Sequence, residues 1–320
     1  MRTKGIEIII AIALGVIIPS LLVVLLQDRE IKTEPPSESV ETTAAKAAED
    51  NRIAVLLEDN GVVWIPLEEY VLSVVLSEMP VDFEIEALKA QAVVARTYAL
   101  RRAEKGWKHA SAAVCTRSSC CQGYISLADY LNKGGKETAI DKVRKAIVST
   151  TGIALIYQGK LIDATYFSCS GGLTEDAQAV WGTEVPYLKS VTSPGEEKAT
   201  HYVDTVQYTS VEFLQKLGLP ANNKIKITNI EYTEGGGIAT VVINSQPFSG
   251  TQLRKLLKLR STSLYITSVG DTVIITSKGY GHRVGMSQYG AEAMAVNGAT
   301  FDQILTHYYS GVELIPFDAD

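Results

Sequence analysis

The chain has 320 residues, 46% of them hydrophobic and 21% charged, and its formal net charge is −6. This length can bury one large hydrophobic core or two modest ones. Residues 1–27 carry a net charge of +1 and residues 28–51 carry −4, which leaves −3 for residues 52–320. Such a mildly acidic domain is a poor candidate for binding nucleic acid, because the phosphate backbone attracts basic surfaces.

An apolar run near the N-terminus, Ile8–Leu26, has about 19 residues and is long enough to cross a bilayer as a helix. No small-residue cleavage site follows Leu26 directly, which argues against a removed signal peptide. Arg2 and Lys4 precede the run, and such basic residues stay on the cytoplasmic side. Residues 1–27 are therefore expected to form a cytoplasmic tip and one transmembrane helix in the cell membrane. A buried core helix is the alternative.

Residues 28–51 are polar and acidic, include Pro35 and Pro36, and have few large apolar side chains. Such a segment cannot build a core, so it is predicted to be a flexible linker. Residues 52–320 then form an extracytoplasmic domain. Hairpin and helix patterns follow one another there without a regular βαβ order, which predicts the α+β fold class. Residues 207–275 are a possible inserted subdomain.

Apolar periodicity separates the expected strands from the expected helices of this domain. Strands are expected at residues 53–57, 62–66, 153–157, 161–166, 226–232, 238–243, 263–267 and 272–276. Helices are expected at residues 67–78, 84–103, 138–149, 209–217, 251–257, 287–296 and 301–308. Residues 107–124 and 170–200 show no clear period and are expected to be largely loops.

The helix expected at residues 84–103 is apolar or small nearly all round, which is typical of a buried helix. Three polar side chains nevertheless lie in it: Lys89, Gln91 and Arg96. Buried cations are rare unless they are paired, because an unpaired buried charge is very unfavourable. These side chains therefore either pair with structural carboxylates or border a polar cleft.

Glu78 lies at the predicted C-terminal end of the helix at residues 67–78, because Pro80 cannot continue that helix. The helix dipole disfavours a negative charge at this end, and the neighbouring side chains are apolar. Both effects raise the pKa of a carboxyl group. A carboxyl that keeps its proton near neutral pH can act as a general acid. An exposed glutamate at a frayed helix end is the alternative.

A cluster of potential metal ligands follows, with the spacing His109-x5-Cys115-x4-Cys120-Cys121. One imidazole and up to three thiolates within 13 residues can form a tetrahedral zinc site. The spacing is wider than the Cys-x2-Cys of zinc ribbons. On the outer side of a membrane, a disulfide from Cys115 to Cys120 or Cys121 is the alternative.

A second polar segment, residues 166–172, reads Tyr-Phe-Ser-Cys-Ser-Gly-Gly, and its paired glycines allow close backbone approach. From the residues alone, a tight structural turn is an adequate explanation. A serine nucleophile is not indicated, because the Gly-x-Ser-x-Gly elbow is missing. Cys169 acting as a nucleophile together with His282 is a further alternative.

A third segment, residues 279–290, combines glycines with His282, Ser287, Gln288 and Tyr289. Its spacing differs from that of a nucleotide-binding turn, and no βαβ unit surrounds it. Hydrogen-bonding groups beside aromatic faces suit a polyhydroxyl ligand such as a sugar, although a loop capped onto a helix is the structural alternative. The candidate aromatic faces are Tyr280, Tyr289, Tyr166 and Trp181.

A basic group near the expected helix at residues 251–257 comprises Arg254, Lys255, Lys258 and Arg260. The simplest interpretation is a solvated helix face. Contact with an anionic wall polymer or with a partner protein is the functional alternative.

The string SEMP, followed by EALKAQAVVARTYAL and later by GHRVGMSQYGA, closely resembles the stage II sporulation protein D family, membrane-anchored lytic transglycosylases of endospore-forming bacteria. The resemblance covers residues 53–320. It implies that Glu78 is the catalytic acid and base in the cleavage of peptidoglycan glycan strands. It also implies that the substrate-contacting residues are Lys89, Gln91, Arg96, Tyr166, Ser170, His282, Ser287, Gln288 and Tyr289.

The resemblance further implies a structural zinc ion bound by His109, Cys115 and Cys121. Relatives often have a histidine where this chain has Cys120, which leaves the fourth ligand open. The family setting is engulfment during sporulation, on the mother-cell membrane facing the septal space. The partners it implies are stage II sporulation proteins P and M. A cysteine-dependent peptidase or amidase and a non-catalytic glycan-binding module are the alternative functions.

Overall fold

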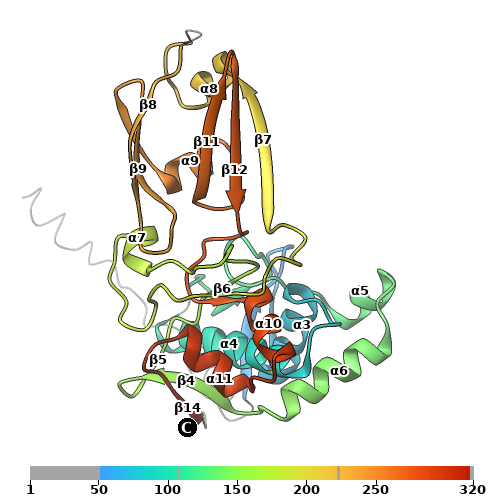
Figure 1. The fold of residues 1–320 in the computed structure, drawn as a ribbon. Helices are drawn as coiled ribbons and strands as arrows, with labels where there is room; N and C mark the ends of the chain where they lie inside the picture. Colours follow the sequence, from blue (N-terminus) through green and yellow to red (C-terminus); the bar gives the residue numbers. More distant parts are fainter. Residues whose placement is uncertain (1–50, 107, 222–223, 318–320) are drawn as a thin grey trace, which may run out of the picture. The chain divides into compact units, whose positions relative to one another are not determined.

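The computed structural model describes residues 51–106, 108–221 and 224–317 (Figure 1). These residues form nine helices and several small sheets, which confirms the mixed α+β class. The predicted transmembrane helix and nearly all of the predicted linker lie outside the described residues. Within the described ranges, no helix is both long and apolar enough to span a bilayer.

Two consecutive helices lie at the centre of the larger core: α3 (Leu67–Glu78) and α4 (Ile85–Glu104). Helix α3 ends at Glu78 because Met79 is extended and Pro80 follows it. Helix α4 is buried along most of its length and packs against α3 and, most extensively among the elements that follow it, against four later ones. The two predicted helices are thus confirmed to within one residue at each end.

The four later elements are α6 (Glu137–Val148), β4 (Ile153–Tyr157), α10 (Gln288–Val296) and α11 (Phe301–Tyr308). They come from distant parts of the sequence and surround α4 (Figure 1). The amphipathic helices α6 and α11 each turn an apolar face towards this core. Short helices α5 (Leu127–Asn132) and α7 (Ala177–Trp181) contribute little buried surface.

Three small sheets border the larger core. In the first, β1 (Arg52–Leu56) pairs antiparallel with β2 (Val62–Pro66) and parallel with β3 (Val114–Cys115). In the second, β4 pairs with β5 (Lys160–Leu161) and with the C-terminal β14 (Glu313–Pro316). In the third, β6 (Tyr166–Phe167) runs parallel to β13 (Met286–Ser287).

One strand prediction was wrong in extent. A single strand was expected over residues 161–166, but the structure divides this stretch into β5 and β6. The chain leaves β4 after two paired residues, and Tyr166 then pairs with Met286 instead. This exchange of partner brings the segment at residues 166–172 beside the segment at residues 279–290.

A second hydrophobic core is built from residues between Val206 and Ile275. One of its sheets has the order β11 (Ser263–Val269), β12 (Thr272–Lys278) and β7 (Val203–Thr209). The other has the order β10 (Gln246–Ser249), β9 (Ile238–Ile243) and β8 (Ile227–Tyr232). Helices α8 (Ser210–Lys216) and α9 (Gly250–Leu256) begin with capping boxes at Thr209 and Ser249. The predicted subdomain at residues 207–275 falls within this region, and its boundaries remain a prediction.

A buried arginine connects the two cores. Arg283 forms an ion pair with Glu175 (3.0 Å) and donates to the Gly235 carbonyl in the turn between β8 and β9 (2.6 Å). Its other donors bond to the carbonyls of Ser170 (2.7 Å) and Leu173 (2.8 Å). One guanidinium thus joins the loop at residues 170–175 to the β8–β9 turn, which suits its five fixed donors.

Candidate active site

The Glu78 side chain leaves the last residue of α3 and enters a cleft of about 480 Å³. The cleft is formed by segments of the chain that are far apart in sequence. Its lining residues are Glu78, Tyr98, Ser118, Cys121, residues 164–168, residues 280–282 and Gln288. Among these described lining residues, Glu78 carries the only carboxyl group.

The structure therefore brings together the motifs that the sequence placed far apart. Tyr166 comes from β6, His282 follows β12, and Gln288 begins α10. All three line the same cleft as Glu78. The predicted aromatic face is present as well, because Tyr280 lines the cleft and Trp181 packs against the His282 ring at 5.4 Å between centroids.

A chain of hydrogen bonds positions the Glu78 carboxyl. The backbone N–H of Gly123 donates to Glu78 Oε1, and the Tyr166 hydroxyl also hydrogen bonds to Glu78. Gln122 donates from Nε2 to the Tyr166 hydroxyl (3.3 Å) and accepts at Oε1 from the Tyr70 hydroxyl (3.1 Å). The acid is thus held from one side by a loop and from the other by a tyrosine that is itself anchored.

Burial raises the pKa of Glu78 above its ordinary value of 4.5. The hydrogen bonds from Gly123 and Tyr166 act in the opposite direction, because they stabilise the carboxylate, but burial has the larger effect. No basic residue occupies the last turn of α3 to offset the helix dipole. The protonated form of Glu78 is therefore favoured relative to a free glutamate.

Gly123 approaches Glu78 and Ser77 so closely that a larger residue there would displace their side chains. A Cβ atom there would lie 2.8 Å from Glu78 Oε1 and 2.9 Å from Ser77 Oγ, which is too close for either contact. The missing side chain lets the backbone N–H reach the carboxyl directly.

The His282 ring is neutral, because burial and, to a smaller degree, the charge of Arg254 lower its pKa to about 4. Its Nδ1 accepts a hydrogen bond from the Val284 N–H (3.1 Å), so the ring proton is on Nε2. The ring packs edge-on against Phe167 at 5.6 Å between centroids. His282 therefore offers the cleft an uncharged, rigidly held aromatic surface.

Gln91 acts behind the cleft. Gln288, which lines the cleft, donates from Nε2 to the buried Gln91 Oε1 (3.4 Å). Gln91 thus holds the Gln288 side chain in place through this hydrogen bond.

Ser170 and Ser287 are fully buried and meet at a third residue, Glu196. Glu196 Oε2 accepts from the Ser170 hydroxyl (2.8 Å) and N–H (2.9 Å) and from the Gly171 N–H (2.8 Å). Its Oε1 accepts from the hydroxyls of Ser193 (2.7 Å) and Ser287. These bonds tie the loop after β6 to the first turn of α10, so the two serines hold the wall of the cleft.

Lys89 and Arg96 both pair with carboxylates. Lys89 Nζ lies 2.6 Å from Glu86, and the fully buried Arg96 forms two bonds to Glu68, at 2.8 and 2.6 Å. This arrangement matches the structural alternative for the two cations. Neither is among the described residues that line the cleft, so their contact with substrate remains a prediction.

Tyr289 is half-buried and packs edge-on against Phe83, at 5.1 Å between ring centroids. It also lies outside the set of lining residues. The contact of Tyr289 with the substrate remains a prediction.

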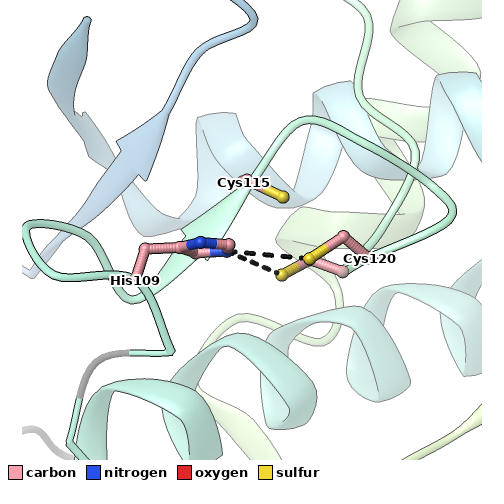
Figure 2. Close-up of side chains that lie close together, drawn as sticks. His109, Cys115 and Cys120 are labelled. Atoms are coloured by element: carbon pink, nitrogen blue, oxygen red, sulfur yellow. Dashed lines mark hydrogen bonds between the residues drawn. The ribbon is translucent and has the colours of Figure 1, made fainter. Parts of the chain in front are cut away.

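His109, Cys115, Cys120 and Cys121 come together in one cluster, with ligand atoms that all lie within 4.8 Å of one another (Figure 2). All four cysteines of the chain are free thiols in the structure. His109 Nε2 lies 3.5 Å from the Cys121 sulfur and 3.9 Å from the Cys120 sulfur. In a tetrahedral zinc site, nitrogen and sulfur ligands are separated by about 3.5 Å, so the donor set and its spacing could hold a metal ion.

The potential metal cluster and the cleft share one loop. Cys121 is both a member of the cluster and a lining residue, and the next two residues, Gln122 and Gly123, hold Tyr166 and Glu78. A metal bound to Cys121 would thus fix the loop that positions the acid.

Sequence reasoning missed four residues of this site: Tyr70, Gln122, Gly123 and Glu196. Gln122 and Gly123 directly follow the predicted metal ligands. The sequence therefore pointed to this segment, but no pattern in it indicated what these two residues do. Glu196 lies in a polar stretch without periodicity. No local pattern in that stretch distinguishes a buried acceptor of six hydrogen bonds from an exposed acid.

The fold and the cleft define the class of protein: a mixed α+β protein with a cleft whose described lining residues carry one carboxyl group beside neutral polar and aromatic side chains. Comparisons with known proteins agree on the family. Residues 58–157 match the family described as "Stage II sporulation protein". The chain is 37% identical to stage II sporulation protein D of Bacillus subtilis (strain 168) over 336 residues, which cover 100% of this chain and 97% of that protein.

Two further relatives are similar over most of this chain. Stage II sporulation protein D of Bacillus amyloliquefaciens is 41% identical over 260 residues, which cover 80% of this chain and 76% of that protein. The protein named "Amidase enhancer" from Bacillus subtilis (strain 168) is 30% identical over 300 residues, with 76% and 40% covered. The chain belongs to the stage II sporulation protein D family, whose name places it in sporulation.

Proposed function

We propose that this protein is a lytic transglycosylase that cleaves the β-1,4 bond between N-acetylmuramic acid and N-acetylglucosamine in peptidoglycan glycan strands. The observation that carries the proposal is the Glu78 carboxyl, partly buried in a cleft with no second carboxyl among the described lining residues. Membership of a sporulation family supports a role in remodelling the cell wall during engulfment.

Glu78 is the acid of the first step. It donates its proton to the glycosidic oxygen while the bond from that oxygen to the anomeric carbon of the muramic acid breaks. The raised pKa of Glu78 supports this role, because the protonated form must be present when substrate binds.

Glu78 is the base of the second step. Its carboxylate accepts the proton of the muramic acid 6-hydroxyl as that oxygen bonds to the anomeric carbon of the same sugar. The product has a 1,6-anhydro end, no water is consumed, and the carboxyl regains its proton. The hydrogen bonds from Gly123 and Tyr166 stabilise the carboxylate that exists between the two steps.

A single carboxyl group is sufficient for this reaction. Glycosidases that add water generally use two carboxyl groups on opposite sides of the bond. Asp82, Glu84 and Glu86 are close to Glu78 in sequence but are not among the described lining residues. The composition of the cleft therefore favours the transglycosylase reaction over hydrolysis.

The aromatic and amide groups of the cleft bind the sugars. Tyr166, His282 and Gln288 are the proposed direct contacts, and Gln91, Ser170 and Ser287 act through Gln288 and Glu196. Neutral side chains suit the uncharged hydroxyl and acetamido groups of a glycan.

The ion in the cysteine cluster is proposed to be zinc in a structural site. His109, Cys115, Cys120 and Cys121 provide four ligands, and a zinc ion with four protein ligands has no open position for a reacting water. Its contribution is to fix the loop that ends at Gly123. Cys120 is the proposed fourth ligand.

The setting is proposed to be the mother-cell membrane, with the N-terminus in the cytoplasm and the cleft facing the septal wall. The substrate is a glycan strand whose stem peptides have been removed, and stage II sporulation proteins P and M are the proposed membrane partners. The position of Cys169 argues against a cysteine-dependent peptidase, because this residue is not among the described residues that line the cleft. Burial and Glu196 raise the pKa of the Cys169 thiol to about 12, so it does not supply a thiolate at neutral pH.

The test is to incubate the full chain, purified in detergent, with peptide-free glycan strands and to identify the new ends by mass spectrometry. A lytic transglycosylase gives ends that are one water lighter than those of a hydrolase. Reducing ends without the anhydro ring would contradict the proposal, and so would retention of the strands without any shortening, which is the behaviour of a binding module.

A further inference from the structure

The basic group Arg254, Lys255, Lys258 and Arg260 is not used by the proposed reaction, and the structure separates its members. Lys255 and Lys258 are exposed, whereas Arg254 and Arg260 are half-buried. The two arginines are therefore not part of a solvated helix face. They lie next to residues that line the cleft.

One carbonyl joins the arginines to the cleft. The carbonyl oxygen of Arg260 accepts a hydrogen bond from the Gly281 N–H (3.1 Å) and another from Arg254 Nε (3.2 Å). Gly281 lines the cleft, so the Arg254 side chain is anchored at the edge of it. The charge of Arg254 also contributes to the lowered pKa of His282, a second lining residue.

The two arginines have different electrostatic partners. Arg260 lies 3.6 Å from the Asp204 carboxylate, and its guanidinium stacks over the Tyr280 ring at 4.8 Å from the centroid. Arg254 makes no ion pair with any of the described residues, and its one hydrogen bond uses Nε, which leaves both terminal nitrogens available. Arg254 is therefore a partly buried cation whose terminal nitrogens are not engaged by any described residue.

The surroundings of Arg254 can admit a ligand group. A cavity of about 280 Å³ is lined by Thr251, Arg254, Lys255 and Leu259. The two free guanidinium nitrogens present the forked geometry that matches a carboxylate. The Tyr280 ring, which is 38% exposed, lines the neighbouring cleft and gives a sugar an aromatic surface there.

We propose that Arg254 is a specificity-determining residue that binds the carboxylate of a sugar acid as the glycan extends from the cleft. This inference rests on the proposed function and identifies the chemical group of the substrate that Arg254 binds. In a peptidoglycan strand, the free carboxylate is on the lactyl ether of muramic acid, and it is exposed when no stem peptide is attached. Arg260 is a positioning residue, because its carbonyl fixes Arg254 and its guanidinium fixes Tyr280.

The test measures binding, which separates it from the test of catalysis. Full-length protein carrying Glu78→Gln is titrated by calorimetry with peptide-free glycan fragments and with the same fragments after the lactyl carboxylates have been converted to amides. The free carboxylate form is expected to bind about tenfold or more tightly than the amide form, as is typical of hydrogen bonds between charged groups.

Two variants assign the effect to a residue. Arg254→Gln in the same protein is expected to bind both fragments equally, at the affinity of the amide form. Lys258→Gln removes the same charge from the exposed part of the basic group and is expected to retain the full discrimination. Thermal unfolding of each variant checks that it is folded.

Three results would overturn the inference. The first is equal affinity of the starting protein for the two fragments, which does not depend on the folding of any variant. The second is discrimination that survives Arg254→Gln. The third is an equal loss of discrimination in Lys258→Gln, since it indicates general attraction of the basic group to anions. None of these results bears on whether Glu78 forms anhydro ends.

Discussion

The backbone N–H of Gly123 donates a hydrogen bond to the Glu78 carboxyl, although the two residues are 45 positions apart in the chain. Gly123 lies two residues after Cys121, so one short loop serves both the proposed acid and the potential metal site. The position of Glu78 therefore depends on how firmly this loop is held.

Replacing Gly123 tests this dependence. In Gly123→Ala, the new Cβ would lie 2.8 Å from Glu78 Oε1, so the carboxyl must move or the loop must retreat. A displaced catalytic group reduces the rate of anhydro-end formation by about tenfold to a hundredfold. Initial rates on peptide-free glycan measure the effect. Gly61→Ala in the β1–β2 turn, where the new Cβ meets only the Asp59 side chain, is the matched control. Equal rates in the two variants would contradict the positioning role.

The pH dependence of stability follows from the raised pKa of Glu78. The folded protein holds this proton more tightly than the unfolded chain, whose carboxyl has the ordinary value of 4.5. The associated stability is fully present below that value and is lost as the pH rises through the folded pKa. Glu78→Gln removes this loss, so the variant is expected to be more stable than the wild type at pH 8, with the difference fading towards pH 4. Urea unfolding at a series of pH values measures it, and a constant difference would contradict the raised pKa.

Much of the larger core could be predicted from the sequence, because its signals are local. Helices α3 and α4 follow from apolar periodicity and from Pro80, and the hairpin of β1 and β2 follows from a short polar turn. Strand β7 was not predicted. It alternates between half-buried and exposed residues, and it becomes a strand only by pairing with β12.

The sequence could predict several residues of the site, but it could not predict which of them contact one another. Glu78, Tyr166 and His282 could be singled out by residue type and local setting. The pairing of Lys89 with Glu86 follows from their spacing of three residues on one helix, but the partner of Arg96 could not be predicted, because Glu68 is 28 residues away on another helix. The same holds for Glu196, whose partners are spread over residues 169–171, Ser193 and Ser287.

Replacing Glu196 tests whether this residue holds the cleft wall. In Glu196→Gln, the amide oxygen can replace Oε2 and keep the N–H groups of Ser170 and Gly171, but the amide nitrogen then replaces Oε1, so the hydroxyls of Ser193 and Ser287 lose their charged acceptor. The variant is expected to lose about 2–4 kcal/mol in the free energy of unfolding, as is typical when a buried hydrogen-bond network is broken. Chemical denaturation measures the loss. The exposed neighbour Glu197 provides the control, Glu197→Gln, and a loss of the same size in both would contradict the role of Glu196.

Zinc content tests the four-ligand site. The purified chain is expected to retain about one zinc ion through dialysis against a weak chelator, and Cys120→Ser is expected to lose it, because a structural zinc site uses four ligands. Atomic spectroscopy measures the metal. Cys169→Ala removes a thiol outside the cluster and is expected to retain the ion. Full retention in Cys120→Ser would show that Cys120 is not a ligand.

The central claim is that one carboxyl group acts in turn as acid and base. The most direct measurement compares wild-type protein with Glu78→Gln on peptide-free glycan strands and counts 1,6-anhydro ends by mass spectrometry. The account predicts that the wild type produces these ends and that the folded variant produces none above background, because an amide neither donates the required proton nor accepts one. Anhydro ends formed by Glu78→Gln at the wild-type rate would contradict it.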